Sequence, residues 1–96
     1  METTIIMTNC KSPYGSYIEF KIKGGAFIGE VDTLNKREHG KTGYRVFYGE
    51  HGRSRQIADR SNKDSAIALL QESIKAGIQG PVEFKWNVMQ YKYKFA

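Results

Sequence analysis

The feature that most constrains the fold is a strand–turn–strand pattern in residues 16–31. Residues 16–23 alternate between polar and apolar side chains, and the apolar face holds Ile18, Phe20 and Ile22. A period of two is typical of a half-buried strand. Gly24-Gly25 follows, and because glycine adopts positive φ angles readily, it suits a two-residue hairpin turn. The pattern therefore predicts a β-hairpin.

The register of this hairpin follows from the same residues. A turn at Gly24-Gly25 pairs the apolar positions of the two strands: Ile22 with Phe27, Phe20 with Gly29, and Ile18 with Val31. The large side chains then share one face, so the turn and the hydrophobic pattern favour the same register. This register also sets Glu19 opposite Glu30, a mildly unfavourable pair of like charges.

Further strands flank this hairpin. Residues 3–8 favour a strand that ends in the turn-forming segment 9–15, and residues 35–43 form a polar loop with two glycines. Residues 44–48 and 53–58 predict a second hairpin. Its register stays open, because the apolar residues on either side of Phe47 compete with it for the buried face.

A helix is predicted to follow, from Ser61 to Gly77. Ser61 is the expected N-cap, and Asp64 three residues later resembles a capping box. Apolar residues at helical spacing form one stripe: Ala66, Ile67, Leu70, Ile74 and Ala76. Gly77 predicts a left-handed stop at the C-terminus of the helix.

The last strand begins at Val82 and changes parity. Apolar residues occupy even positions in 82–88, with Trp86 in the core, and odd positions in 89–95. A regular strand cannot change parity without an extra residue, so we expect a bulge or break near residues 87–90, or else a strand with apolar residues on both faces. The aromatic end of this strand could also pair with a second copy, which leaves a homodimer open.

These elements predict an α+β fold. One helix packs on one face of an antiparallel sheet of five or six strands, in the order βββββαβ. The 96 residues form a single domain, residues 1–96, because domains of this size hold one core and no linker-like segment interrupts the chain.

The cysteine content and hydropathy bear on the compartment. Cys10 is the one cysteine, so an internal disulfide is excluded and a reducing compartment is favoured. No segment approaches the roughly 20 apolar residues that cross a bilayer, and the first residues lack the pattern of a signal peptide. We therefore expect a cytoplasmic protein with no membrane partner.

The residues that usually carry catalysis are sparse. His39 and His51 each lie in a Glu-His-Gly turn far from Cys10, which provides too few ligands for a metal site. Gly40-Lys41-Thr42 lacks the earlier glycine of a phosphate-binding loop and precedes a strand rather than a helix. Without an acid, base and nucleophile in a recognisable pattern, we expect neither an enzyme nor a cofactor.

The positive charge is concentrated in residues 36–63, called the basic window below. It contains every arginine, with eight basic and three acidic residues, and so accounts for the whole net charge of +5. Arginine is suited to phosphate and carboxylate, and interleaved aromatic rings can stack on bases. The residues predicted to bind nucleic acid or another anionic partner are Arg37, Lys41, Arg45, Tyr48, Arg53, Arg55, Arg60 and Lys63.

Part of the chain resembles the AP2-type DNA-binding domains of phage integrases. The resemblance rests on the order of a basic strand at 43–48, a turn at His51-Gly52, a second basic strand at 53–57 and a helix containing 65–70. In that family a three-stranded sheet enters the major groove. The resemblance implies that Arg45, Arg53 and Arg55 contact bases or phosphates.

The whole chain also resembles small single-domain proteins that phages use against host defence, including anti-CRISPR proteins. This resemblance implies a phage-encoded inhibitor in the cytoplasm of the host cell. It would bind stoichiometrically to a host nucleoprotein complex, through its nucleic acid or an acidic protein surface. Our leading hypothesis from the sequence is therefore a non-enzymatic binding protein with an arginine-rich hairpin, and the alternative is a sequence-specific AP2-like domain.

Overall fold

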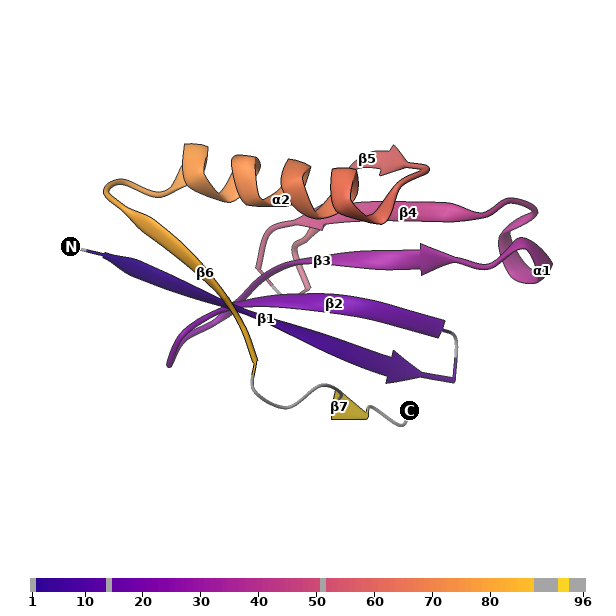
Figure 1. Ribbon diagram of the computed structural model, residues 1–96, viewed down its shortest axis with the longest axis horizontal. Coiled ribbons are helices and arrows are strands. Elements are labelled where there is room, and N and C mark those ends of the chain that lie inside the picture. Colours follow the sequence, from indigo (N-terminus) through magenta and orange to yellow (C-terminus); the bar gives the residue numbers. More distant parts are fainter. Residues whose placement is uncertain (1, 14, 51, 88–91, 94–96) are drawn as a thin grey trace.

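The computed structural model describes residues 2–13, 15–50, 52–87 and 92–93. Its elements are β1 (Thr3–Ser12), β2 (Gly15–Ile22), β3 (Phe27–Leu34), α1 (Lys36–His39), β4 (Gly43–Tyr48), β5 (Arg55–Arg60), α2 (Lys63–Gly77), β6 (Val82–Trp86) and β7 (Lys92–Tyr93). The strands form one twisted sheet in the order β5-β4-β3-β2-β1-β6, and β7 continues the β6 side along β1 (Figure 1). The predicted α+β class and element order are confirmed, with α1 and β7 as short additions.

All neighbouring strands from β1 to β5 are antiparallel, whereas β6 and β7 run parallel to β1. This parallel pairing arises because α2 returns the chain across the sheet to the far edge, as in other strand crossovers. α2 packs on one face of the sheet, against β4, β3 and β5 (Figure 1). No helix in the described part of the chain is long and apolar enough to span a membrane.

The core lies between α2 and this face of the sheet. Its buried residues come from four strands and the helix: Ile5, Met7, Ile18, Phe20, Val31, Val46, Ala66, Leu70 and Ile74. Gly29 lies beneath the middle of the helix, where a Cβ would be 2.6 Å from the carbonyl oxygen of Phe47 and 3.1 Å from Leu70 Cδ1. Glycine at this position therefore allows the helix to approach the sheet closely.

The β2–β3 hairpin forms with most of its predicted register. Phe20 pairs with Gly29 and Ile18 with Val31, and Glu19 faces Glu30 as expected. Near the turn, however, Phe27 pairs with Lys21 rather than Ile22 because a bulge follows Phe20. The loop is also wider than two residues, since the Ile22 N–H donates to the Ala26 carbonyl at 3.0 Å.

Three predicted boundaries were wrong. β1 continues through the expected turn to Ser12, because residues 9–12 pair with β2, and pairing overrides their turn propensity. Within the expected loop 35–43, Asn35 caps the short helix α1. β5 spans Arg55–Arg60 rather than 53–58.

Both predicted helix caps of α2 also need correction. Asn62, not Ser61, is the N-cap, and its side chain accepts a hydrogen bond from the Ser65 N–H at 3.1 Å. Gly77 is not among the positive-φ glycines, so it does not form a left-handed stop. Its missing Cβ instead makes room for the Tyr48 hydroxyl, which lies directly against it.

The expected interruption of the last strand is present in the register. Met7 pairs with Trp86 and Cys10 pairs with Lys92. The chain therefore advances six residues from Trp86 to Lys92 while β1 advances three, so the pairing with β1 is interrupted between them. Residues 88–90, where we placed the bulge, lie outside the described residues, as do the later aromatic positions 91 and 95 on which the homodimer hypothesis depends. Trp86 is 49% exposed, which contradicts its expected place in the core, because α2 covers β3–β5 rather than the β6 edge.

Candidate functional site

The predicted binding residues lie along the β4–β5 hairpin and the segments at its two ends. Arg37 is on α1, Lys41 follows that helix, and Arg45 and Tyr48 are on β4. Arg53 lies in the β4–β5 turn, Arg55 and Arg60 lie at opposite ends of β5, and Lys63 begins α2. Five residue steps along a strand span about 17 Å, so the basic window is divided between two ends of the hairpin.

Arg45 lies between carboxylates on the face of the sheet opposite α2. Its cross-strand neighbours are Asp32 on β3 and Asp59 on β5, and its guanidinium carbon is 5.5 Å from the centroid of the Phe47 ring. Both Arg45 Nε and Asp32 Oδ1 are buried and have no hydrogen-bond partner among the described residues. The acidic neighbours compete with an external phosphate, so Arg45 is a poor candidate for the site.

Tyr48 occupies the opposite face of β4, where it packs against the core beside α2. Its hydroxyl lies under Gly77 at the end of the helix. The ring is therefore part of the helix–sheet contact and is not presented to a partner for stacking. This packing removes Tyr48 from the candidate surface.

Near the end of β5, the carboxylate of Asp59 neutralises part of the positive charge of the basic window. Lys41 Nζ lies 3.3 Å from Asp59 Oδ2, and both side chains are exposed. Arg60 donates to the carbonyl oxygen of Asp59 at 2.7 Å. An exposed ion pair contributes little to stability, but it lowers the net charge that Lys41 presents to a partner.

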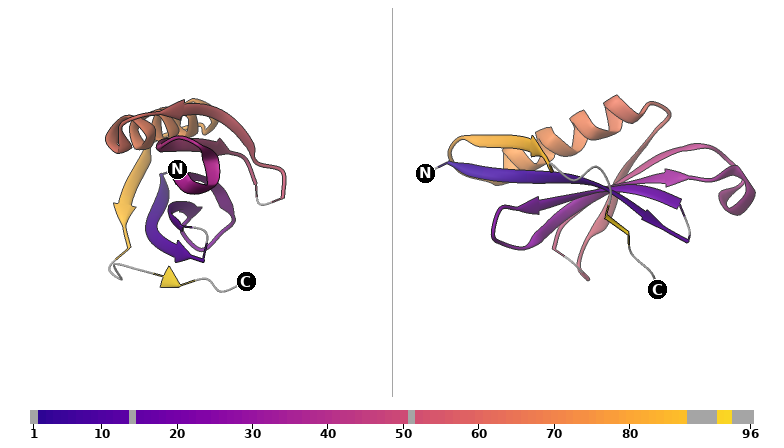
Figure 2. Two further views of the ribbon diagram at one scale, coloured as in Figure 1. Left: turned by 90° about the vertical axis from the view of Figure 1, so that its right-hand side faces the viewer. Right: turned by 60° about the horizontal axis from the view of Figure 1, so that its bottom comes forward.

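Arg53 and Arg55 stand apart from these pairs. Both side chains are exposed, and neither forms an ion pair or side-chain hydrogen bond with any residue that the structure describes. Figure 2 shows the β4–β5 hairpin projecting sideways from the rest of the sheet in its left view. The two arginines are therefore at the accessible end of a protruding hairpin.

The backbone holds this end of the hairpin in place. The Gly49 N–H donates to the Ile28 carbonyl at 2.9 Å, and the Arg53 N–H donates to the Glu50 carbonyl at 2.8 Å. One extra residue on β5, Ile57, forms a bulge between the pairs Val46–Ala58 and Phe47–Gln56. The bulge leaves Ile57 44% exposed and resolves the open register, with Val46 and Tyr48 facing α2.

Lys63 belongs to a different group of residues, around a cavity of about 220 Å³ at the start of α2. The floor is apolar, with Ile18 and Val31, and the polar lining includes Asn9, Lys11, Ser16, Thr33, Tyr44 and Lys63. Sequence reasoning missed Lys11 because the segment 9–15 read as a turn. The alternation of Asn9 and Lys11 with Cys10 was the signal for a longer strand.

Tyr17 on β2 has a clearly perturbed pKa. Its cross-strand neighbours on the face opposite α2 are Cys10 and Asp32. Burial, together with the neighbouring Cys10, Glu19 and Glu30, raises the pKa of the Tyr17 phenol above its ordinary value. A phenol that resists ionisation does not favour a role as a base.

Among the described residues, no group of three or more His, Cys, Asp or Glu side chains could hold a metal ion. His51 and the side chain of His39 lie outside the described residues. No protein-family model matches the chain, and no curated protein or solved structure matches it significantly.

Proposed function

We propose that this protein is a non-enzymatic binding protein that holds nucleic-acid phosphates with Arg53 and Arg55. The observation that carries the proposal is the exposure of these two arginines, without acidic partners among the described residues, at the end of a projecting hairpin. A guanidinium fork forms paired hydrogen bonds with phosphate oxygens. The hydrogen-bonded turn limits the ordering entropy lost on binding.

The acidic residues of the sheet support a contact through the hairpin end rather than through the sheet face. An AP2-like domain would place its three-stranded sheet in the major groove, and here β3, β4 and β5 followed by α2 have the corresponding order. The face of this sheet that α2 leaves uncovered would have to meet the DNA. That face, however, carries Glu30, Asp32 and Asp59, whose charges repel phosphates. This repulsion favours the hairpin proposal over AP2-like sequence recognition.

The biological setting that we propose is stoichiometric inhibition of a host defence nucleoprotein complex by a phage-encoded protein. A small domain with a protruding arginine hairpin is suited to contact the nucleic acid of such a complex, or an acidic surface beside it. The proposal needs no catalytic residue, because occupancy of the site is sufficient for inhibition.

The test is the salt dependence of nucleic-acid binding. Fluorescence anisotropy with labelled single-stranded and duplex DNA, from about 50 to about 200 mM salt, gives the slope of log K against log salt. For Arg53→Ala/Arg55→Ala we expect weaker binding and a slope shallower by about 1.4 to 1.8, which corresponds to two phosphate contacts.

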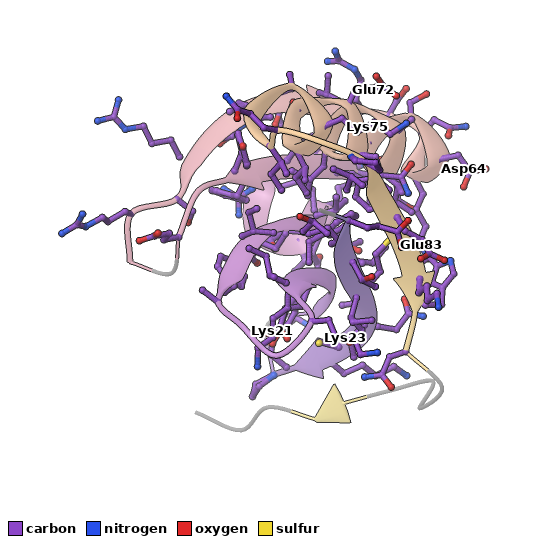
Figure 3. All side chains as sticks on the ribbon, turned by 90° about the vertical axis from the view of Figure 1, so that its left-hand side faces the viewer. Lys21, Lys23, Asp64, Glu72, Lys75 and Glu83 are labelled. Atoms are coloured by element: carbon purple, nitrogen blue, oxygen red, sulfur yellow. The ribbon has the colours of Figure 1, made fainter. Side chains whose placement is uncertain are left out.

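The matched control is Lys75→Ala/Lys85→Ala, which removes the same charge. Lys75 lies 3.5 Å from Glu72 and Lys85 lies 3.5 Å from Glu83, so both charges are already paired; Figure 3 shows Lys75 beside Glu72 on α2. We expect the control to bind much as the wild type does. An arginine variant with the same affinity and slope as this control contradicts the proposal.

A second assay separates nucleic acid from an acidic protein surface. If nucleic acid does not bind, affinity purification from a host lysate treated with nuclease tests for a protein partner. If the wild type recovers a protein complex of fixed stoichiometry and the arginine variant does not, the ligand of Arg53 and Arg55 is a carboxylate surface rather than phosphate. Failure of both assays refutes the proposed function.

A further inference from the structure

The cavity at the start of α2 has a chemistry of its own, separate from the β4–β5 turn. Most of its lining comes from the face of the sheet that α2 packs against, where the pairs are Asn9–Ile18, Lys11–Ser16, Ile18–Val31 and Thr33–Tyr44. Cys10 and Tyr17, which pair across β1 and β2, also line it. The helix begins at Lys63, so it leaves this end of the face open. The result is a recess with a sheet for its floor and the first turn of α2 at its side.

The polar groups of the recess suit an anion. Lys11 enters from β1 and Lys63 from α2, so the two cations come from separate elements at its rim. Of the described residues that line the cavity, none is Asp or Glu. Hydroxyl groups from Ser16, Thr33 and Tyr44 add hydrogen-bond donors. Two lysines that line one recess contribute positive potential there.

The number of donors favours phosphate over carboxylate. A phosphate monoester offers three terminal oxygens, whereas a carboxylate offers two, and lysine binds phosphate as a point charge. The buried side chains of Ile18 and Val31, which are 3% and 1% exposed, form an apolar base for the organic part of a ligand. The volume of about 220 Å³ is below the roughly 300–1,000 Å³ of sites for drug-sized ligands.

From these observations we infer that the cavity binds a phosphate monoester group, with Lys11 and Lys63 on the phosphate and at most one nucleoside of the ligand inside the cavity. The ligand is either a free sugar phosphate or nucleotide, or the 5′-phosphate at the end of a nucleic-acid strand. The inference does not depend on the proposed hairpin function, because Arg53 and Arg55 are absent from the described lining of the cavity.

The test is a titration followed by amide chemical shifts in ¹⁵N-labelled protein. The probes are ribose 5-phosphate, adenosine 5′-monophosphate, adenosine and succinate, each up to about 10 mM, which covers the weak affinity of fragment-sized ligands. We expect saturable shifts at Lys11, Ser16, Thr33 and Lys63 with the two phosphates and not with adenosine. Equal or tighter binding of succinate would overturn the assignment of phosphate.

Two lysine variants of one helix provide the matched comparison. Lys63→Ala and Lys75→Ala each remove one exposed lysine from α2, and alanine keeps the helix stable at both positions. We expect about a 10-fold loss of affinity for ribose 5-phosphate in Lys63→Ala, equivalent to one charge-assisted contact, and little change in Lys75→Ala. Equal affinities in the two variants would overturn the inference. Lys11→Thr, which keeps a strand-forming residue, is expected to act like Lys63→Ala.

A further arm distinguishes the two sources of phosphate. The affinities of tetranucleotides with and without a 5′-phosphate are compared with that of adenosine 5′-monophosphate. If only the phosphorylated tetranucleotide binds more tightly than the mononucleotide, the ligand is the strand end. If it does not bind more tightly, the ligand is the free nucleotide or sugar phosphate. Shifts confined to the Arg53–Arg55 turn, or no saturable shift at all, refute the cavity site. The salt-slope result for Arg53→Ala/Arg55→Ala stands independently of either outcome.

Discussion

At the scale of single residues, Tyr17 shows how position in the sheet changes chemistry. Its burial raises its pKa, whereas an unfolded chain ionises its tyrosines near pH 10. A pKa that is higher in the folded state contributes stability below pH of about 10, and this contribution is lost as the pH rises from there toward the folded-state pKa.

The prediction for Tyr17 concerns the alkaline limit of stability. We expect the free energy of unfolding of the wild type to fall more steeply above pH of about 10 than that of Tyr17→Phe, because only the wild type must ionise this phenol in its unfolded state. Urea unfolding at several pH values from neutral to alkaline measures both profiles. The other tyrosines are common to both proteins, so parallel profiles would show that Tyr17 ionises freely in the fold.

The arginines illustrate what residue type alone leaves open. Arg45 and Arg53 are equivalent in the sequence, since both lie in the basic window among aromatic and glycine residues. The structure places Arg45 between Asp32 and Asp59, while Arg53 is exposed in a turn. The distribution of charge along the sequence therefore identifies the basic window, but the neighbouring residues on adjacent strands determine which of its arginines are accessible.

At the scale of elements, α2 is well encoded by its apolar stripe. Ala66, Leu70 and Ile74 are its buried residues, as their spacing predicted. Its exact first residue was harder to predict, because Ser61 and Asn62 are adjacent and both residue types cap helices well. The chain enters the helix with Asn62 in the extended conformation that an N-cap requires.

The prediction for this element compares the two adjacent residues. We expect Asn62→Ala to lower the free energy of unfolding by about 1 kcal/mol, because it leaves the Ser65 N–H without its cap. Ser61→Ala is the control, and we expect it to change stability by less than about 0.5 kcal/mol, as at most surface positions. Thermal or urea unfolding measures both. A larger effect at Ser61 than at Asn62 would contradict the assigned cap.

At the scale of the whole molecule, the two ends of the chain are joined through the sheet. β6 pairs with β1 from Thr3–Val82 to Met7–Trp86, and Phe84 contacts Phe20 edge to face with ring centroids 6.4 Å apart. These contacts close the core on the side that α2 leaves uncovered. The protein consequently depends on a contact between residues far apart in sequence.

A deletion and a substitution test this dependence. Removal of residues 82–96 takes away β6 and the Phe84 contact, so we expect the truncated chain to lose its cooperative thermal transition by circular dichroism. Phe84→Ala in the full chain is the milder variant, with an expected loss of about 2 to 3 kcal/mol for a partly buried phenylalanine. A truncated chain that unfolds like the wild type would show that β6 is dispensable.

The sequence by itself determined the α+β class, the order of the elements and the faces of β2 and α2, because these follow from local periodicity and propensity. It also located the basic window. The tertiary structure decided the parallel partner of β1, the bulge at Ile57, the interior position of Tyr48 and the meeting of Lys11 with Lys63 at one cavity. These features depend on contacts between segments that are far apart in the sequence. The energies of such contacts cannot be read from the periodicity or propensity of any short segment.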